Sequence, residues 1–330
     1  MYPELLCAGD QVRIIAPSRS LSIIDDAVVD LAVRRLTQLG LRVTFGEHVR
    51  EILPYYHCGS LESRLADLHQ AFVDGDVKAI LTVVGGYNSN QLLPYINYGL
   101  IRDNPKIFCG LSDITALQNA IFSRTGLVTF SGPHFSSFGM KQGFAYTQSY
   151  FERIFFRQED RFPVEPSDKF SSDVWHLCQD SRMFQANSGM IPIQPGSAEG
   201  RIIGGNLCTL NLLLGTEYMP SLQDTVLFLE DTCGLHSNFL LEFDRNLEAL
   251  TQQPDFPGVR GLVFGRPEDG GEMTVEKWRL LIQGKPALKD IPILIHANFG
   301  HTTPIFTFPI GGYCRMELGE TVRLEIRKHG

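Results

Sequence analysis

Ser112 lies where a serine side chain could act as a nucleophile. It follows the short apolar run Lys106–Cys109 and Gly110, and apolar residues recur at helical spacing after it, from Ile114 onward. This pattern predicts a buried strand, a tight turn and a helix whose first turn carries the hydroxyl. Unpaired N–H groups and the helix dipole favour negative charge there. A serine in this position can also be a simple helix N-cap, so nucleophilic chemistry needs partners elsewhere in the chain.

His301 and Glu230 are candidates for the base and the acid that an acyl-transferring serine needs. His301 lies in NFGHTTP, directly after an apolar strand, between Gly300 and Pro304. Histidine is suited to this task because its unperturbed pKa lies near neutrality, although a histidine of a surface loop would show the same pattern. Glu230 ends the apolar strand in TVLFLEDT, where burial would strengthen its pull on an imidazolium. Asp231 fits nearly as well, and the pattern alone leaves both open.

Two turns, Gly85–Asn90 and Gly110–Asp113, could supply the oxyanion hole. Each follows an apolar strand, and ligands of parallel sheets bind at the carboxyl ends of the strands. The amide of Asp113 and an amide from the start of the glycine turn are the expected donors. The glycine turn, GGYNSN, lacks the lysine and spacing of a Walker loop and is not GxGxxG. The alternative is a glycine turn that only precedes a helix.

The order of the expected elements indicates two domains. Strands alternate with helices over about the first 140 residues, which predicts a doubly wound α/β domain, taken as residues 1–150. The pattern loosens over 151–195, which we interpret as a linker that could cover the site. Trp175 in this segment is either an anchor to the core or a wall for a flat substrate group. Residues 196–330 form the second domain, and FPIGGYCRMELGETVRLEI near its end predicts an antiparallel hairpin.

Composition restricts the function classes. The 330 residues, 43% hydrophobic and 20% charged, are typical of a globular protein with enough apolar surface for two cores. A net charge of −8 without a basic run argues against a nucleic-acid partner. No apolar run reaches about eighteen residues and the N-terminus has no basic signal region, so we expect no membrane span and a cytoplasmic location. Seven scattered cysteines without a CxxC pair predict reduced packing residues rather than zinc ligands or disulfides.

Several longer blocks of the sequence are similar to one family. The blocks GGYNSNQLLPYINY, NPKIFCGLSDITAL, TGLVTFSGPHFSSF, GRIIGGNL, LFLED and FGHTTPIFTFPIGG resemble, in order and spacing, the LD-carboxypeptidase family of serine peptidases. Within that family they resemble the microcin C immunity peptidases most. The resemblance covers nearly the whole chain and leaves out mainly residues 151–195.

The resemblance implies a triad of Ser112, Glu230 and His301 and so favours the glutamate as the acid. It also implies an oxyanion hole from the backbone amides of Gly86 and Asp113, and a mechanism without a metal or another cofactor. The family further implies an α/β N-terminal domain with a mainly parallel sheet and a mostly β C-terminal domain. It also implies that the protein is a homodimer. The triad would then lie in the cleft between the domains.

The expected substrate depends on which branch of the family the sequence resembles more. NSNQLLPY and GHTTPI resemble the immunity branch more, which implies hydrolysis of the amide that joins a peptidyl or aminoacyl group to a modified nucleotide. The alternatives are an LD-carboxypeptidase that trims peptidoglycan stem peptides, and a module that binds a peptide or nucleotide without catalysis. A nucleotide would need an aromatic wall for its base. The candidate substrate contacts are Gly85, Tyr87, Asn88 and Trp175.

Overall fold

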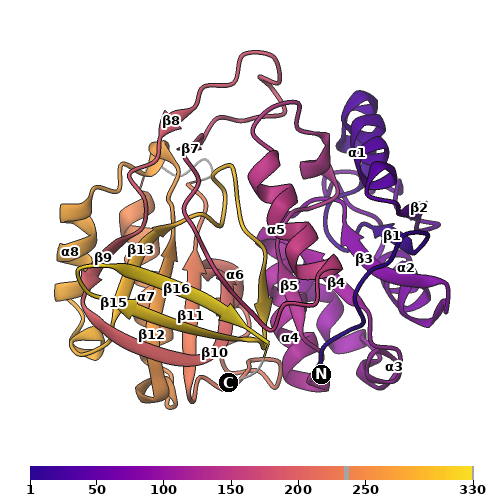
Figure 1. Ribbon diagram of the computed structural model, residues 1–330. Helices are drawn as coiled ribbons and strands as arrows, with labels where there is room; N and C mark the ends of the chain where they lie inside the picture. Colours follow the sequence, from indigo (N-terminus) through magenta and orange to yellow (C-terminus); the bar gives the residue numbers. More distant parts are fainter. Residues whose placement is uncertain (234–237, 329–330) are drawn as a thin grey trace.

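The computed structural model describes residues 1–233 and 238–328, which form two large sheets side by side (Figure 1) and a small two-stranded one. Within these residues the first sheet has six strands: β1 (Gln11–Ile15), β2 (Arg42–Phe45), β3 (Val77–Thr82), β4 (Ile107–Gly110), β5 (Thr129–Ser131) and β14 (Phe308–Ile310). Their order is β14-β5-β4-β3-β1-β2. The pairs among β1 to β5 are parallel, and β14 is antiparallel to β5.

Helices cover both faces of this sheet. They are α1 (Asp26–Gln38), α2 (Leu61–Val73), α3 (Tyr98–Asp103), α4 (Thr115–Thr125) and α5 (Ala145–Phe156). α1 and α5 share a core with strand residues such as Val12 and Cys109, whereas α2, α3 and α4 share a core with Ile80 and Phe108. A parallel sheet with buried apolar strands needs such cover on both faces. The predicted doubly wound α/β domain is therefore confirmed.

The second sheet has eight strands within the described ranges. They are β6 (Arg161–Pro163), β9 (Ile191–Gln194), β10 (Gly196–Asn206), β11 (Thr225–Glu230), β12 (Val259–Gly265), β13 (Ile293–Ala297), β15 (Tyr313–Leu318) and β16 (Val322–Arg327). Their order is β6-β16-β15-β10-β11-β12-β13-β9. The central strands β10 to β13 run parallel, and the flanking pairs are antiparallel. The prediction of a second, β-rich domain is confirmed.

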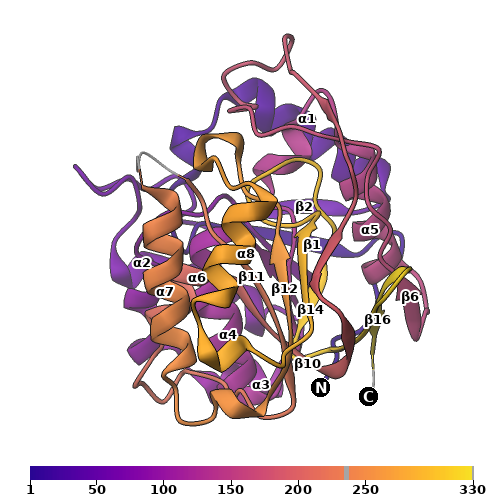
Figure 2. The same cartoon turned by 90° about the vertical axis from the view of Figure 1, so that its left-hand side faces the viewer.

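Three helices accompany the second sheet: α6 (Leu207–Asn211), α7 (Phe239–Thr251) and α8 (Val275–Gln283). α7 and α8 lie next to each other against the strands (Figure 2). Their contact is aromatic, since the ring of Trp278 lies 5.2 Å from Phe243 and 4.8 Å from Phe264 of β12 between centroids. No helix in the described part of the chain is long and apolar enough to cross a membrane.

The segment 151–195 is more structured than the expected linker. It completes α5, adds β6 and β9 to the two edges of the second sheet, and pairs β7 (Lys169–Phe170) with β8 (Gln185–Ala186). In Figure 1 the loop between β7 and β8 rises above both sheets. These strands have two to four residues, which is too short for a hydrophobic period to show in the sequence.

Helix α4 and strand β14 both help to join the two sheets. Helix α4 lies between them: the Asn119 side chain donates to the Gly204 carbonyl at 2.8 Å, and the Thr115 hydroxyl accepts from the Asn206 N–H at 2.9 Å. The second contact is β14, which belongs to the C-terminal half of the chain but pairs with β5. The predicted terminal hairpin is formed by β15 and β16 only, because the FPI at the start of that stretch joins the first sheet instead.

Candidate active site

Ser112 lies in a left-handed turn directly after β4. Its φ is +64°, a conformation that costs a non-glycine residue on the order of 1 kcal/mol or more and is concentrated at functional sites. A 3₁₀ turn, Ser112–Ile114, follows and leads into α4. The N-cap interpretation of the serine is wrong, because the cap positions of the turn and of α4 are Leu111 and Ile114. The Ser112 hydroxyl is therefore free for another partner.

Gly85 makes room for this turn. A Cβ atom at Gly85 would lie 2.8 Å from the Ser112 Cβ, 3.1 Å from its Oγ and 3.4 Å from the Asp113 nitrogen. Real Cβ atoms do not approach so closely, so the glycine turn after β3 and the serine turn after β4 fit together only without a side chain here. The two loops predicted from the carboxyl ends of the strands do meet.

The three triad residues form one hydrogen-bonded chain. Glu230 ends β11 and is only 3% exposed. Its Oε2 accepts from Nδ1 of His301 at 2.7 Å, and Nε2 of His301 accepts from Oγ of Ser112 at 3.0 Å. Gly300 has φ +102° and passes beside the Glu230 carboxylate, which brings the next residue, His301, into contact with it. Asp231 instead accepts from the Asn206 side chain at 3.0 Å.

Electrostatics make His301 a strong base. Burial acts to lower its pKa, but the negative charge of Glu230 and the hydrogen bond to it outweigh burial and raise the pKa to about 9. Within the described residues, the other oxygen of Glu230, Oε1, has no hydrogen-bond partner, so the imidazole is what compensates this buried carboxylate. His134 lies near enough that burial and the positive charge of His301 lower its pKa to about 3, and it hydrogen-bonds Thr82 as a neutral ring.

Of the two expected oxyanion donors, Asp113 follows the serine in the chain and Gly86 follows the glycine that contacts it. The Asp113 amide is next to Gly85, and within the described ranges the Gly86 N–H donates no hydrogen bond inside the protein. Both amides are at the carboxyl ends of neighbouring strands, β4 and β3. An oxyanion hole needs such backbone donors, free and fixed, next to the nucleophile.

The other expected substrate contacts differ in their availability. Tyr87 is 82% exposed, and the Arg19 guanidinium lies 5.3 Å from its ring centroid. Asn88 is occupied internally, because its side chain donates to the Cys58 sulfur and its N–H to Asp113. Trp175 is half-buried and packs against the core shared by α1 and α5, which fits the role of an anchor for its loop.

Sequence reasoning missed the side chains that support the site. Ser18 donates from the end of β1 to the Asp113 carboxylate at 2.6 Å, and Asn206 links Asp231 to Thr115 at the start of α4, the helix that follows Ser112. The same rule that found the glycine turn, a polar residue at the carboxyl end of a parallel strand, could have found Ser18 in the sequence APSRS. In the described part of the chain, no three His, Cys, Asp or Glu side chains are arranged to hold a metal ion.

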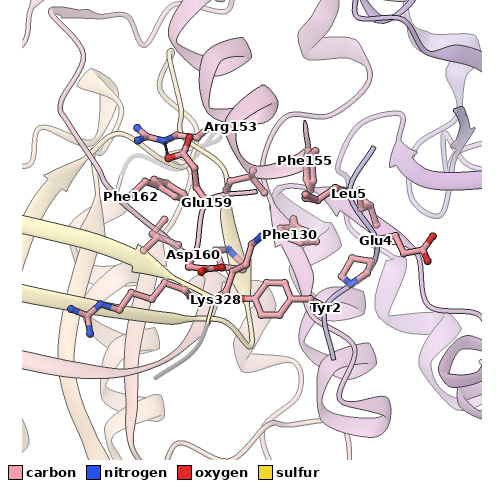
Figure 3. A pocket seen from close by; sticks show the side chains of 16 residues that line it. Tyr2, Glu4, Leu5, Phe130, Arg153, Phe155, Glu159, Asp160, Phe162 and Lys328 are labelled. Carbon is pink, nitrogen blue, oxygen red and sulfur yellow. Dashed lines mark hydrogen bonds and ion pairs between the residues drawn. The ribbon is translucent and has the colours of Figure 1, made fainter. Parts of the chain in front are cut away.

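Two cavities of the described residues lie away from Ser112, Glu230 and His301. One of about 60 Å³, with room for a few water molecules, lies near the chain termini between Tyr2 and Lys328 (Figure 3). A groove of about 750 Å³ runs along α5 and reaches Pro304. Neither Ser112, Glu230 nor His301 lines them, so the site is identified by its hydrogen bonds rather than by a hollow.

Comparison with protein families identifies the family of this chain. Residues 12–132 match the LD-carboxypeptidase N-terminal domain, and residues 199–316 match the LD-carboxypeptidase C-terminal domain. The chain belongs to the LD-carboxypeptidase family. It is a serine hydrolase of the peptidase type, and the resemblance stated from the sequence is confirmed.

Two members of the LD-carboxypeptidase family from Bacillus subtilis (strain 168) carry provisional carboxypeptidase names. YocD is 47% identical over 330 residues, 100% of this chain and of that protein. A second, named as a murein peptide carboxypeptidase, is 32% identical over 96% of this chain and 92% of its own. The family is thus shown over the full length of the chain.

Solved structures of the LD-carboxypeptidase family share the fold. The MccF-like protein from Bacillus anthracis str. Ames has a TM-score of 0.98 and 51% identity, and all of both chains is covered. The protein MccF in complex with glutamyl sulfamoyl guanosine has a TM-score of 0.87 and 26% identity over 99% of each chain. The second of these holds an aminoacyl-nucleotide analogue.

Proposed function

We propose that this enzyme hydrolyses the amide that links a peptidyl or aminoacyl group to a modified nucleotide, with Ser112 as nucleophile, His301 as base and Glu230 as the acid that orients the base. The observation that carries the proposal is the hydrogen-bonded chain from the Ser112 hydroxyl through the imidazole to a buried carboxylate. Such an arrangement is what acyl transfer by a serine requires. The activity amounts to immunity against antibiotics of the microcin C type.

The reaction proceeds in two halves. His301 takes the proton of Ser112 while Oγ attacks the amide carbonyl, and the developing oxyanion accepts hydrogen bonds from the N–H groups of Gly86 and Asp113. His301 then gives the proton to the leaving nitrogen as the C–N bond breaks. A water molecule, deprotonated by the same imidazole, releases the acyl group from the serine. Glu230 stabilises the imidazolium in both halves.

The nucleotide substrate is supported by what the related structure binds. MccF holds glutamyl sulfamoyl guanosine and shares this fold over 99% of each chain. We propose that the exposed Tyr87 ring lines the substrate at the rim, and that Trp175, besides anchoring its loop to the core, presents its remaining surface as the wall for a base. Gly85 would contribute through its backbone, and Asn88 would have to exchange the contacts that its side chain and N–H make with Cys58 and Asp113.

A murein substrate is the alternative that a specific observation favours. The Bacillus subtilis protein named as a murein peptide carboxypeptidase is 32% identical to this chain. The bond cleaved would again be an amide, here between an L- and a D-amino acid, so the same triad would serve. The two functions differ in the groups on either side of the amide bond and share the triad.

One experiment separates the two functions. Purified enzyme is incubated with aspartyl sulfamoyl adenosine and, separately, with murein tetrapeptide, and the product masses are measured; the Ser112→Ala variant is the control. We expect free sulfamoyl adenosine and aspartate from the first, and no product from the variant. Trimming of the tetrapeptide while the nucleotide conjugate survives would refute the nucleotide substrate but not the triad.

We propose further that the enzyme acts as a cytoplasmic homodimer, with units at 1–150 and 196–330 joined by 151–195. All seven cysteines are unpaired, which suits a reducing compartment. Sedimentation equilibrium tests the dimer, and cell fractionation tests the location. A monomer at micromolar concentration would overturn the first of these.

A further inference from the structure

The Asp113 side chain is buried and holds three donors on a single oxygen. It is 2% exposed. Its Oδ2 accepts from the Ser18 hydroxyl at 2.6 Å, from the Asn88 N–H at 3.0 Å and from the Ser89 N–H at 2.9 Å. Charge-assisted hydrogen bonds of this kind are about twice as strong as neutral ones, so the carboxylate is a strong local constraint.

These donors come from the carboxyl ends of two other strands. Ser18 follows β1 and Asn88 follows β3, whereas Asp113 itself follows β4. The Ser89 hydroxyl returns a hydrogen bond to the Asp113 carbonyl at 2.6 Å. One residue therefore ties together three loops at the edge of the sheet where the nucleophile lies.

The first residues of the glycine turn, Gly85–Asn90, lie between the residues that hydrogen-bond Asp113. A Cβ at Gly86 would lie 2.2 Å from the Ser18 Oγ, so the Gly86 backbone rests directly on the hydroxyl that Asp113 binds. On the far side, the buried Arg64 donates to the carbonyls of Pro17 and Asn88. The Arg64 guanidinium braces the same two loops.

We infer that the Asp113 carboxylate is a positioning residue for the oxyanion hole: it fixes the glycine turn so that the Gly86 N–H converges with the N–H of Asp113 itself. The inference rests on the proposed function of the triad. Its physical basis is that oxyanion stabilisation depends on donors fixed before the reaction. We call the Asp113 carboxylate with its three hydrogen bonds the clamp. Since Asp113 contributes one oxyanion donor through its own N–H and holds the glycine turn through its side chain, the clamp positions both donors relative to Ser112.

Three variants and a matched control test the clamp. Asp113→Ala removes the acceptor, Asp113→Asn keeps an oxygen without the charge, and Ser18→Ala removes one donor. The control is Asp67→Asn, which alters another buried carboxylate of the same sheet region; Asp67 accepts from the His48 N–H. For each we measure kcat and KM on the best substrate, the pH profile, the melting temperature, and the rate of labelling by a fluorophosphonate. In that labelling the Ser112 Oγ–P bond forms, fluoride leaves, and the serine proton passes to His301.

A clamp predicts a specific pattern. Asp113→Ala should lower kcat and the labelling rate together by about 10²- to 10³-fold, the effect of one lost oxyanion donor, with KM changed by less than about three-fold. The acid limb of the pH profile should not move, because His301 and Glu230 are untouched. Asp113→Asn should recover at least about ten-fold of the loss, Ser18→Ala should fall between, and Asp67→Asn should match the wild type.

The possible results distinguish failure of the clamp from failure of the proposed function. If wild type is labelled at Ser112 and Asp113→Ala keeps kcat and labelling within about three-fold per folded molecule, the clamp is overturned while the triad stands. The clamp is also overturned if Asn is no better than Ala. If Asp113→Ala does not fold, the test rests on Asp113→Asn and Ser18→Ala. Wild-type rates in both of these variants would overturn the clamp. A wild type that hydrolyses neither substrate and resists labelling at Ser112 rejects the proposed function, and the inference with it.

Discussion

Replacing Glu230 by glutamine should change both the rate and the pH at which the enzyme works. The glutamine keeps the size of the side chain and removes the charge that faces His301 at 2.7 Å. In the wild type the pKa of His301 is raised from 6.5 to about 9 by that charge, against the opposing effect of burial. A rise of this size corresponds to roughly 3 kcal/mol of preference for the imidazolium. That preference is what the mutation removes.

The direction follows from which form of the base is active. Neutral His301 takes the proton, so kcat/KM of the wild type should rise with pH through an acid limb near pH 9. In Glu230→Gln the largest causes of the raised His301 pKa are removed while burial, which lowers that pKa, remains, so the limb should move down by about two pH units. The plateau should fall by about 10²- to 10⁴-fold, because the imidazolium loses its orienting and stabilising partner.

The assay is a pH profile of kcat/KM from pH 5 to 10 for both enzymes. Asp231→Asn is the matched control, since it removes the neighbouring carboxylate, which does not contact His301 and contributes the smallest of the rises in its pKa. Its limb should move much less than that of Glu230→Gln. An acid limb that stays in place in Glu230→Gln would refute the assignment of His301 as the base tuned by Glu230.

Other predictions follow from separate contacts. Gly85→Ala should slow labelling of Ser112 by at least about 10²-fold, since the new Cβ meets the serine at 2.8 Å; an unchanged rate would contradict the fit of the two turns. Trp175→Ala should raise KM for aspartyl sulfamoyl adenosine by about ten-fold through lost stacking and spare the murein peptide, whereas a lower melting temperature with unchanged KM would make Trp175 an anchor only. The ion pair of Glu230 with protonated His301 should stabilise the wild type fully below pH 6.5 and no longer above pH 9, because the pKa of His301 is higher in the folded state than in the unfolded state. Urea titrations of the wild type and Glu230→Gln at pH 6 and 9.5 measure this difference in unfolding free energy. Trp278→Ala should cost about 3 to 5 kcal/mol of unfolding free energy and leave kcat per folded molecule unchanged, since its contacts are Phe243 and Phe264.

The parallel strands were the most predictable part of the fold. The apolar strand expected before the glycine turn is observed as Val77–Thr82. It could be predicted because a strand buried on both faces must be continuously apolar. The edge strands β6 and β9 could not be predicted. Their pairing depends on distant partners, such as Phe162 of β6 opposite Ile326 of β16, and three or four residues carry no local signal.

The sequence allowed Ser112, Glu230 and His301 to be proposed as a triad, but it did not reveal the side chains that hold the surrounding loops. Ser112 and His301 each follow an apolar strand, and the family resemblance chose Glu230 over Asp231. Pattern alone assigned Asp113 only a backbone role. Its carboxylate binds groups 95, 25 and 24 residues away along the chain, two of them main-chain N–H groups that every residue possesses. No spacing rule can mark such partners.

The position of His301 between the sheets has a consequence for the newly made protein. The loop that carries it leaves the second sheet at β13 and joins the first sheet at β14, 189 residues after the nucleophile. A ribosome delivers the serine early, and N-terminal domains generally fold first during synthesis. Ser112 has no contact with His301 until β13 and β14 have been made and paired. We therefore expect the growing chain to be inactive until most of the polypeptide has been synthesised.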